Sequence, residues 1–157
     1  MAVLVIAEHD NSVLKTSTFN TITAATNLSD DIHLLIIGKD IETLSNNAKS
    51  IYPIKKVLKC DNSKLENFIP ELSAPIISNI ANGYTHVLAP ASTFGKNLLP
   101  RVSALLDITQ ISDVIEIVTE NTFVRPIYAG NAISHVETNQ NINLLTIRPT
   151  SFDKCEE

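Results

Sequence analysis

The chain has 157 residues, a mass of 17.2 kDa and a formal net charge of −5. Its length suits one domain, since globular domains most often run about 100–150 residues. Hydrophobic residues make up 44% of the chain, which excludes a disordered chain, a collagen-like chain and a disulfide-dense secreted module. The acidic balance also excludes the strong positive field with which proteins attract nucleic acid or anionic membranes. Little room remains for a catalytic domain beside a separate cofactor domain.

Short apolar runs alternate with longer amphipathic stretches over the first two thirds of the chain. The short runs predict buried strands at residues 3–7, 32–38, 56–60 and 84–89. Apolar residues at helical spacing predict helices at residues 14–28, 41–51, 70–82 and 97–106. This alternation predicts a three-layer α/β domain, with an open, mostly parallel sheet and helices on both faces.

The last third of the chain has a different pattern, with strands separated by short connections. Strands are predicted at residues 115–118, 122–129, 132–137 and 143–148. Gly130 and Asn131 both tolerate positive φ, so they predict a tight turn between two antiparallel strands. Pro126 lacks a backbone N–H and belongs at a sheet edge or a bulge. We expect antiparallel hairpins here, with residues 143–148 joining the main sheet.

Several features bear on the location of the protein. No apolar run approaches the roughly 18 residues that cross a bilayer. The first apolar run lacks a basic leader and continues into Glu8, so it predicts a strand rather than a signal peptide. Cys60 and Cys155 lie far apart and allow one disulfide at most. The basic group of Lys55, Lys56 and Lys59 predicts a solvated strand edge. A cytoplasmic protein with reduced cysteines is the simplest interpretation.

Hydroxyl and basic side chains gather between the fourth predicted strand and the fourth predicted helix. Ser92, Thr93 and Lys96 stand where free backbone N–H groups of a helix start can hold an anion such as phosphate. A P-loop is excluded, because Pro90 and Asn97 replace the Gly and the Ser or Thr that it requires. Two interpretations remain. One is a nucleotide site of another type, and the other, which we favour, is a helix capped by Ser92 or Thr93.

Other chemistry has little support in the sequence. The histidines at positions 9, 33, 86 and 135 lack metal-ligand spacing, and hydrogen-bonded structural roles are expected for His33 and His86. Residues 8–10 cannot all point at one centre and predict a loop. The four glycines, at positions 38, 83, 95 and 130, form no dinucleotide-binding pattern. Cys60 has no local partner that would mark a nucleophile.

The segment that contains Arg125 and Tyr128 is the second dense stretch of polar and aromatic residues. Both side chains are amphipathic and suit a buried interface. Two interpretations are balanced here: a protein interface and a plain hairpin at a sheet edge.

These two dense segments closely resemble the alpha subunit of electron transfer flavoprotein. The resemblance is strongest in residues 88–101, 105–107, 110–113 and 122–133. Residues 3–9, 19–21 and 146–153 are also similar, so the resemblance covers essentially the whole chain.

The resemblance implies a fold and a place in a larger assembly. It implies an adenine nucleotide alpha hydrolase-like α/β domain at residues 1–153, a short tail at 154–157 and no second domain. The family's alpha subunit pairs with a beta subunit, and its C-terminal domain holds most of the FAD contacts. The heterodimer carries electrons from flavoprotein dehydrogenases, such as acyl-CoA dehydrogenases, to a membrane quinone oxidoreductase. It would lie in the bacterial cytoplasm or the mitochondrial matrix.

The resemblance reaches only the N-terminal domain of that family, so no FAD-contacting residue is carried onto this chain. FAD is expected in the full-length heterodimer and not in this chain alone, and no catalytic or metal-binding residue is expected. The candidates for interface or domain contacts are Arg101, Arg125, Tyr128 and Asn131. The beta subunit holds an AMP in a related fold, whereas this domain is not expected to hold one. A stand-alone adenine-nucleotide module is the alternative, and a hydrolase has no nucleophile–base pair to support it.

Overall fold

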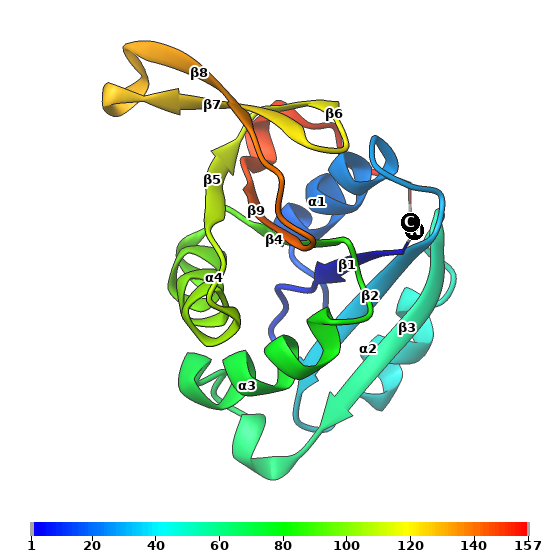
Figure 1. Ribbon diagram of the computed structural model, residues 1–157. Coiled ribbons are helices and arrows are strands. Elements are labelled where there is room, and N and C mark those ends of the chain that lie inside the picture. Colours follow the sequence, from blue (N-terminus) through cyan, green and yellow to red (C-terminus); the bar gives the residue numbers. More distant parts are fainter. Residues whose placement is uncertain (1, 157) are drawn as a thin grey trace.

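A six-stranded parallel sheet forms the centre of the computed structural model, which describes residues 2–156 (Figure 1). Its strands, in the order in which they lie side by side, are β3 (Ile54–Asp61), β2 (Ile32–Gly38), β1 (Val3–Ile6), β4 (His86–Pro90), β9 (Asn143–Ile147) and β5 (Gln110–Val114). Every residue of β1, β4 and β9 is buried, as expected for parallel strands that are covered on both faces.

Helices cover both faces of this sheet and complete three layers. The helices are α1 (Thr16–Thr26), α2 (Glu42–Ala48), α3 (Pro70–Ala81) and α4 (Thr93–Leu106). Val3 and Val5 pack with α1 and α2, whereas Leu4 and Ile6 pack with α3 and α4. Successive side chains of a strand point to opposite faces, so strands such as β1 contribute to two hydrophobic clusters. Both clusters consist of residues of this chain, so the chain forms its own core.

The order of the strands places a crevice between β1 and β4. From β1 the chain moves outward through β2 and β3, and it then returns to the other side of β1 as β4. In open α/β sheets, ligands bind beyond the carboxyl ends of the strands at such a point. The residues that follow β1 and β4 are therefore the first place to look for a site.

A smaller antiparallel sheet projects from the body of the molecule. It consists of β6 (Glu116–Thr119), β7 (Thr122–Ile127) and β8 (Ala132–Glu137). β7 and β8 extend away from the three layers as a hairpin (Figure 1). Phe123 of β7 is fully buried among residues of the main core and fixes the root of this sheet. The prediction of antiparallel hairpins and of a strand at residues 143–148 that joins the main sheet is confirmed.

The sequence missed one strand and placed one helix start too late. β5 contains two buried apolar residues, Ile111 and Val114, and the register of its pairing with β9 shifts between them. Asp113 has a positive φ of 62° there, so the alternation that marks a strand is broken. α4 begins at Thr93 rather than at residue 97.

The edge of the main sheet at β3 carries the basic residues that the sequence singled out. Lys55, Lys56 and Lys59 are exposed on this strand, which pairs with β2. The prediction of a solvated strand edge is confirmed.

The end of the described chain packs on α1. The Asn20 side chain donates a hydrogen bond of 2.7 Å to the Phe152 carbonyl oxygen. The Lys154 ammonium lies 4.8 Å from the centre of the Phe19 ring. Of the predicted domain and tail, positions 1 and 157 lie outside the described residues.

Gly95 allows α4 to start unusually close to β4, which gives a first prediction. A Cβ atom at this position would lie 1.9 Å from the Pro90 carbonyl oxygen, a backbone atom that cannot move away alone. Gly95→Ala should therefore lower the free energy of unfolding by about 3 kcal/mol, the upper range for overpacking. Urea unfolding of the two chains measures the difference.

Gly83→Ala is the matched control for this substitution. A Cβ atom at Gly83 would be 3.6 Å from its nearest neighbour, the Ile80 carbonyl oxygen, which is an ordinary contact. Its unfolding free energy should stay within about 1 kcal/mol of the parent chain. Equal unfolding midpoints for the two variants would contradict the assignment of Gly95 to a required close approach.

Candidate functional site

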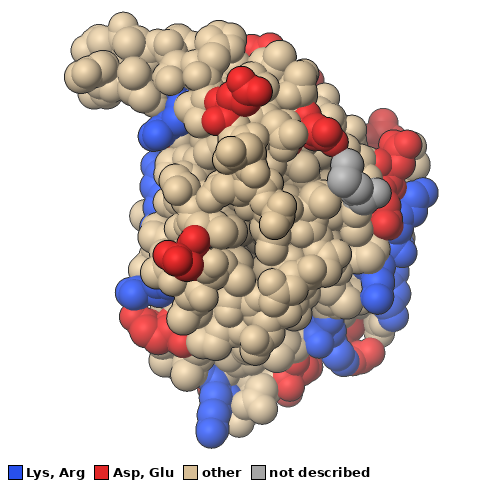
Figure 2. Space-filling view, in the orientation of Figure 1, with Lys and Arg blue, Asp and Glu red and all other residues tan. Residues whose placement is uncertain are grey.

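The tip of the β7–β8 hairpin exposes aromatic and apolar groups. The Tyr128 side chain is 80% exposed and Ile133 is 55% exposed. Residues 126–136 contain no Asp, Glu, Lys or Arg. Accordingly, the visible face of the hairpin that projects at the upper left of Figure 2 shows neither the blue of Lys and Arg nor the red of Asp and Glu. An uncharged projection with an exposed tyrosine has the composition of an interface.

The turn at this tip differs from the one that the sequence predicted. Tyr128, Ala129 and Gly130 all have positive φ, at 49°, 53° and 89°. Asn131 has a φ of −74°. The predicted turn between two antiparallel strands is confirmed, but its left-handed residues are 128–130. Left-handed backbone is uncommon for residues other than glycine, and such strain is found most often at functional sites. Here it turns Tyr128 outward.

Pro126 lies where β7 has a single paired neighbour. β6 pairs with β7 at positions 122–124, and Pro126 lies beyond them, opposite Ile133 of β8. Although β7 is the middle strand, it is a local edge at this point, as the proline predicts.

A cluster of basic side chains surrounds Asp113 near the root of the hairpin. The Arg148 Nε donates to Asp113 Oδ1 at 3.1 Å, and Arg148 Nη2 donates to Asp113 Oδ2. This hydrogen bonding lowers the pKa of the Asp113 carboxyl, while burial acts in the opposite direction. The positive charges of Lys96 and Arg125 lower the same pKa further. Arg148 contacts Asp113 directly, whereas Lys96 and Arg125 act on it through their charge alone.

Arg125 is the member of this cluster that retains unused hydrogen-bonding capacity. Its Nε atom is buried and has no hydrogen-bond partner among residues 2–156. Arg125, Tyr128 and Asn131 all lie on the β7–β8 hairpin. The structure thus brings together three of the four predicted interface residues. Arg101 lies apart from them. It occupies an exposed position on α4 and pairs with Glu71 of α3, at 2.7 Å.

The start of α4 is held by a side chain that the sequence did not single out. Ser92 stands at the N-cap position but caps no backbone N–H, so the prediction of a cap by Ser92 is wrong. Its hydroxyl instead donates to Glu8 Oε2 at 2.8 Å, across 84 residues of sequence. Ser17 donates to the same oxygen at 2.7 Å. Glu8 follows β1 at the crevice, and strand order rather than any local motif identifies its place.

The histidines have structural partners. His9 Nε2 donates to the Ile37 carbonyl oxygen at 3.1 Å, and its Nδ1 accepts from the Asn11 amide at 3.0 Å. His33 bonds Tyr84 Oη at 2.7 Å. The structural roles predicted for His33 and His86 agree with these contacts and with those described next.

His86 joins the small sheet to the main one. Its Nε2 donates to the Glu120 carbonyl oxygen, in the turn between β6 and β7, at 2.7 Å. Its ring packs edge-on against Phe123, with 6.3 Å between the ring centres. Asn143 of β9 donates to the same carbonyl at 3.3 Å. The root of the hairpin therefore depends on the His86 imidazole.

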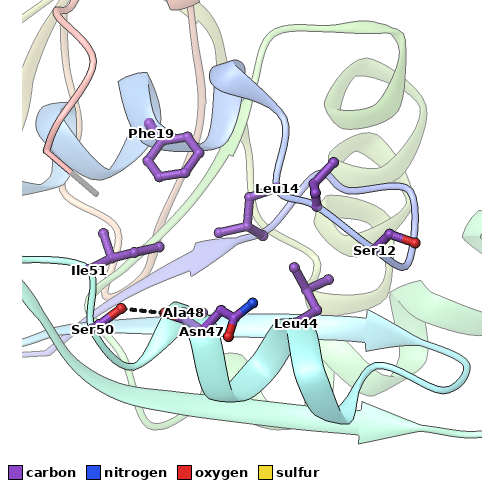
Figure 3. A pocket seen from close by; sticks show the side chains of 9 residues that line it. Ser12, Leu14, Phe19, Leu44, Asn47, Ala48, Ser50 and Ile51 are labelled. Carbon is purple, nitrogen blue, oxygen red and sulfur yellow. Dashed lines mark hydrogen bonds between the residues drawn. The ribbon is translucent and has the colours of Figure 1, made fainter.

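A cavity of about 330 Å³ lies between the N-terminal end of α1 and α2 (Figure 3). It is lined by Ser12, Val13, Leu14, Phe19, Leu44, Asn47, Ala48, Ser50 and Ile51. This lining contains no charged residue and no nucleophile–base pair. It offers no cation for the diphosphate of a dinucleotide, and so it does not fit FAD.

Metal and membrane features are also absent from the described part of the chain. No group of three or more His, Cys, Asp or Glu residues within positions 2–156 could hold a metal ion. Within the same residues, Cys60 and Cys155 form no disulfide. Among the same residues, no helix has the length and hydrophobicity that a membrane crossing requires.

Comparison with known proteins identifies the family. A model described as the electron transfer flavoprotein domain matches residues 3–157. Electron transfer flavoprotein subunit alpha of Pseudomonas aeruginosa is 47% identical over 153 residues, which cover 98% of this chain and 50% of that protein. The mitochondrial subunit alpha of Dictyostelium discoideum is 42% identical over 97% of this chain and 45% of its own length. The subunit alpha of Paracoccus denitrificans is 38% identical over 100% of this chain and 51% of its own length.

The chain belongs to the electron transfer flavoprotein family. It spans about half the length of the curated relatives that it matches, and it corresponds to the N-terminal half of the alpha subunit. The resemblance seen in the sequence motifs is thereby confirmed.

Acid should destabilise this domain through its buried histidines. Burial lowers the pKa of His9 and of His86 from the ordinary value of 6.5, although their backbone hydrogen bonds oppose the change. Below that pH the unfolded chain binds more protons than the folded chain. The free energy of unfolding should fall as the pH drops below about 6.5, by at most about 1.4 kcal/mol per pH unit for each histidine.

Urea unfolding between about pH 7.5 and about pH 5.5 tests this, since the window spans the ordinary histidine pKa. His86→Gln should flatten the pH dependence, because it removes the buried imidazole and leaves only the half-buried imidazole of His9. His135→Gln, on the exposed face of β8, is the control for replacement of an imidazole. A pH dependence that is the same in the parent chain and in His86→Gln would contradict the role of His86.

Proposed function

We propose that this chain acts as the N-terminal domain of an electron transfer flavoprotein alpha subunit, which docks a beta subunit and supports a flavin-binding domain. The observation that carries the proposal is the match over residues 3–157 to the N-terminal half of alpha subunits, at up to 47% identity. Alpha subunits of this family are electron carriers rather than enzymes. In this role the chain contributes a rigid scaffold and a contact surface.

The β7–β8 hairpin is the contact surface that the geometry supports best. Its tip presents Tyr128 at 80% exposure on a segment without charged residues. Tyrosine and arginine contribute more than other residues to the energy of binding at interfaces. Arg125 lies at the base of the tip, on the same hairpin. Together, these features support docking of the beta subunit at the hairpin.

FAD in this proposal belongs to the other half of the alpha subunit. The 330 Å³ cavity has no charged lining, and the N-terminal end of α4 faces the Glu8 carboxylate. Neither place fits the diphosphate of FAD, so no redox step is assigned to residues of this chain. In the heterodimer, flavin would carry electrons from dehydrogenases, acyl-CoA dehydrogenases among them, to a quinone oxidoreductase.

The proposed location follows from the relatives. Their names include both bacterial and mitochondrial alpha subunits, so the heterodimer would lie in the bacterial cytoplasm or the mitochondrial matrix.

A beta subunit of the same family provides the direct test of docking. Isothermal titration of the two purified proteins should show a complex. Tyr128→Ala should weaken it about tenfold or more, because it removes the exposed aromatic group of the hairpin tip. Tyr52→Ala is the matched control, since Tyr52 is 78% exposed and lies between α2 and β3, away from the hairpin. Equal losses of affinity in the two variants would count against the hairpin.

The absorption spectrum of the purified chain tests the place of the flavin. We expect a colourless protein with no band in the visible range, because the cavity between α1 and α2 offers no cation for a dinucleotide phosphate. Stoichiometric bound flavin in this chain alone would overturn the assignment of FAD binding to the other half of the subunit.

A further inference from the structure

The switch point of the sheet contains a carboxylate. Glu8 follows β1 and Ser92 follows β4, the two neighbouring strands between which the direction of the chain order changes. Ligands of open α/β sheets bind beyond the carboxyl ends of such strands, and phosphate groups are held there by the N-terminal end of the next helix. In this chain the next helix is α4, and the negative charge beside it comes from the protein itself.

The carboxylate is bound as an anionic ligand would be. Glu8 Oε2 accepts hydrogen bonds from the Ser92 hydroxyl at 2.8 Å and from the Ser17 hydroxyl at 2.7 Å. These donors come from the starts of α4 and α1, the helices that flank the crevice on opposite faces of the sheet. Hydroxyl donors to a charged oxygen form shorter and stronger bonds than neutral pairs.

The backbone of Glu8 is also fixed in place. Its amide donates to Thr18 Oγ1 at 2.9 Å, and its carbonyl oxygen accepts from the Thr18 hydroxyl, also at 2.9 Å. The Lys15 amide donates to the same carbonyl at 2.9 Å. With its main chain bonded to the start of α1, Glu8 has little freedom to withdraw its side chain from the crevice.

The groups that could hold a phosphate are already engaged. The Ser92 hydroxyl donates its hydrogen bond to Glu8, and Ser92 caps no backbone N–H of α4. The charge of Lys96, the cation in the first turn of α4, already lowers the pKa of Asp113. A phosphate entering at α4 would have to displace the Glu8 carboxylate from Ser92.

We propose that Glu8 is an internal anion that fills the phosphate position at the start of α4 and so excludes nucleotides and other phosphate-bearing ligands from this crevice. Glu8 is then a specificity-determining residue. It makes the domain a scaffold on a fold whose switch point would otherwise take an anion. This assignment stands independently of the docking role proposed above.

Removal of the carboxylate should open the site. Inorganic phosphate is the probe, and the melting temperature of the 157-residue chain is the readout. At a phosphate concentration about ten times its Kd, the melting temperature of Glu8→Ala should rise by about 3–6 °C. The parent chain should show no rise. Sodium chloride at equal ionic strength is the salt control, and AMP in place of phosphate tests whether a nucleotide enters.

Two further variants separate the causes. Glu8→Gln removes the charge but keeps the side-chain volume, so its crevice stays filled and phosphate should not stabilise it. Glu8→Ala combined with Ser92→Ala should lose most of the phosphate response, because the donor at α4 is gone. Glu137→Ala removes an exposed carboxylate of β8 and should respond as the parent chain does.

Each outcome decides the proposal. If Glu8→Ala unfolds in buffer, phosphate but not chloride should restore its folded circular dichroism spectrum, and failure of this rescue overturns the proposal. A folded Glu8→Ala chain that gains no phosphate stabilisation overturns it as well. Saturable shifts of the amide NMR signals of residues 93–95, on addition of phosphate to the parent chain, would also overturn the proposal. They would mean that Glu8 does not exclude the anion.

Discussion

The close approach of α4 to the end of β4 is the contact on which the rest of the structure depends. Gly95 lies so near the Pro90 carbonyl oxygen that no side chain fits between them. The helix can therefore begin directly after the strand. Its start brings Ser92 within reach of Glu8 and Lys96 near Asp113, while its body buries apolar residues against the sheet. One backbone contact thus positions both the crevice and the basic cluster.

The fold could be predicted wherever a local pattern was complete. Continuous apolar runs marked β1 and β2, and helical periodicity marked α1 and α3, because burial against a covered sheet selects those patterns. β5 was not predicted, because the left-handed residue Asp113 interrupts the strand and removes the alternation of apolar and polar residues. The early start of α4 was also not predicted, since the conformation of residues 93–96 depends on packing against β4 more than on their own helix propensity.

Part of the candidate site could also be predicted, because a local sequence pattern marks it. Tyr128 and Arg125 stand within one short segment, and its composition alone suggested an interface. Arg101 was included through the resemblance, but the structure directs it toward α3. Glu8 could not be recognised locally, because its partner Ser92 is 84 residues away. Strand order, which brings the ends of β1 and β4 together, was needed to connect them.

The lysines of β3 have a consequence for how this protein can assemble. An exposed strand edge invites pairing with another chain, and lysine side chains along that edge prevent it. At the opposite edge, Asp113 interrupts the ladder of β5 and is tied to Arg148. Both edges of the central sheet therefore carry features that disfavour pairing with the sheet of another copy.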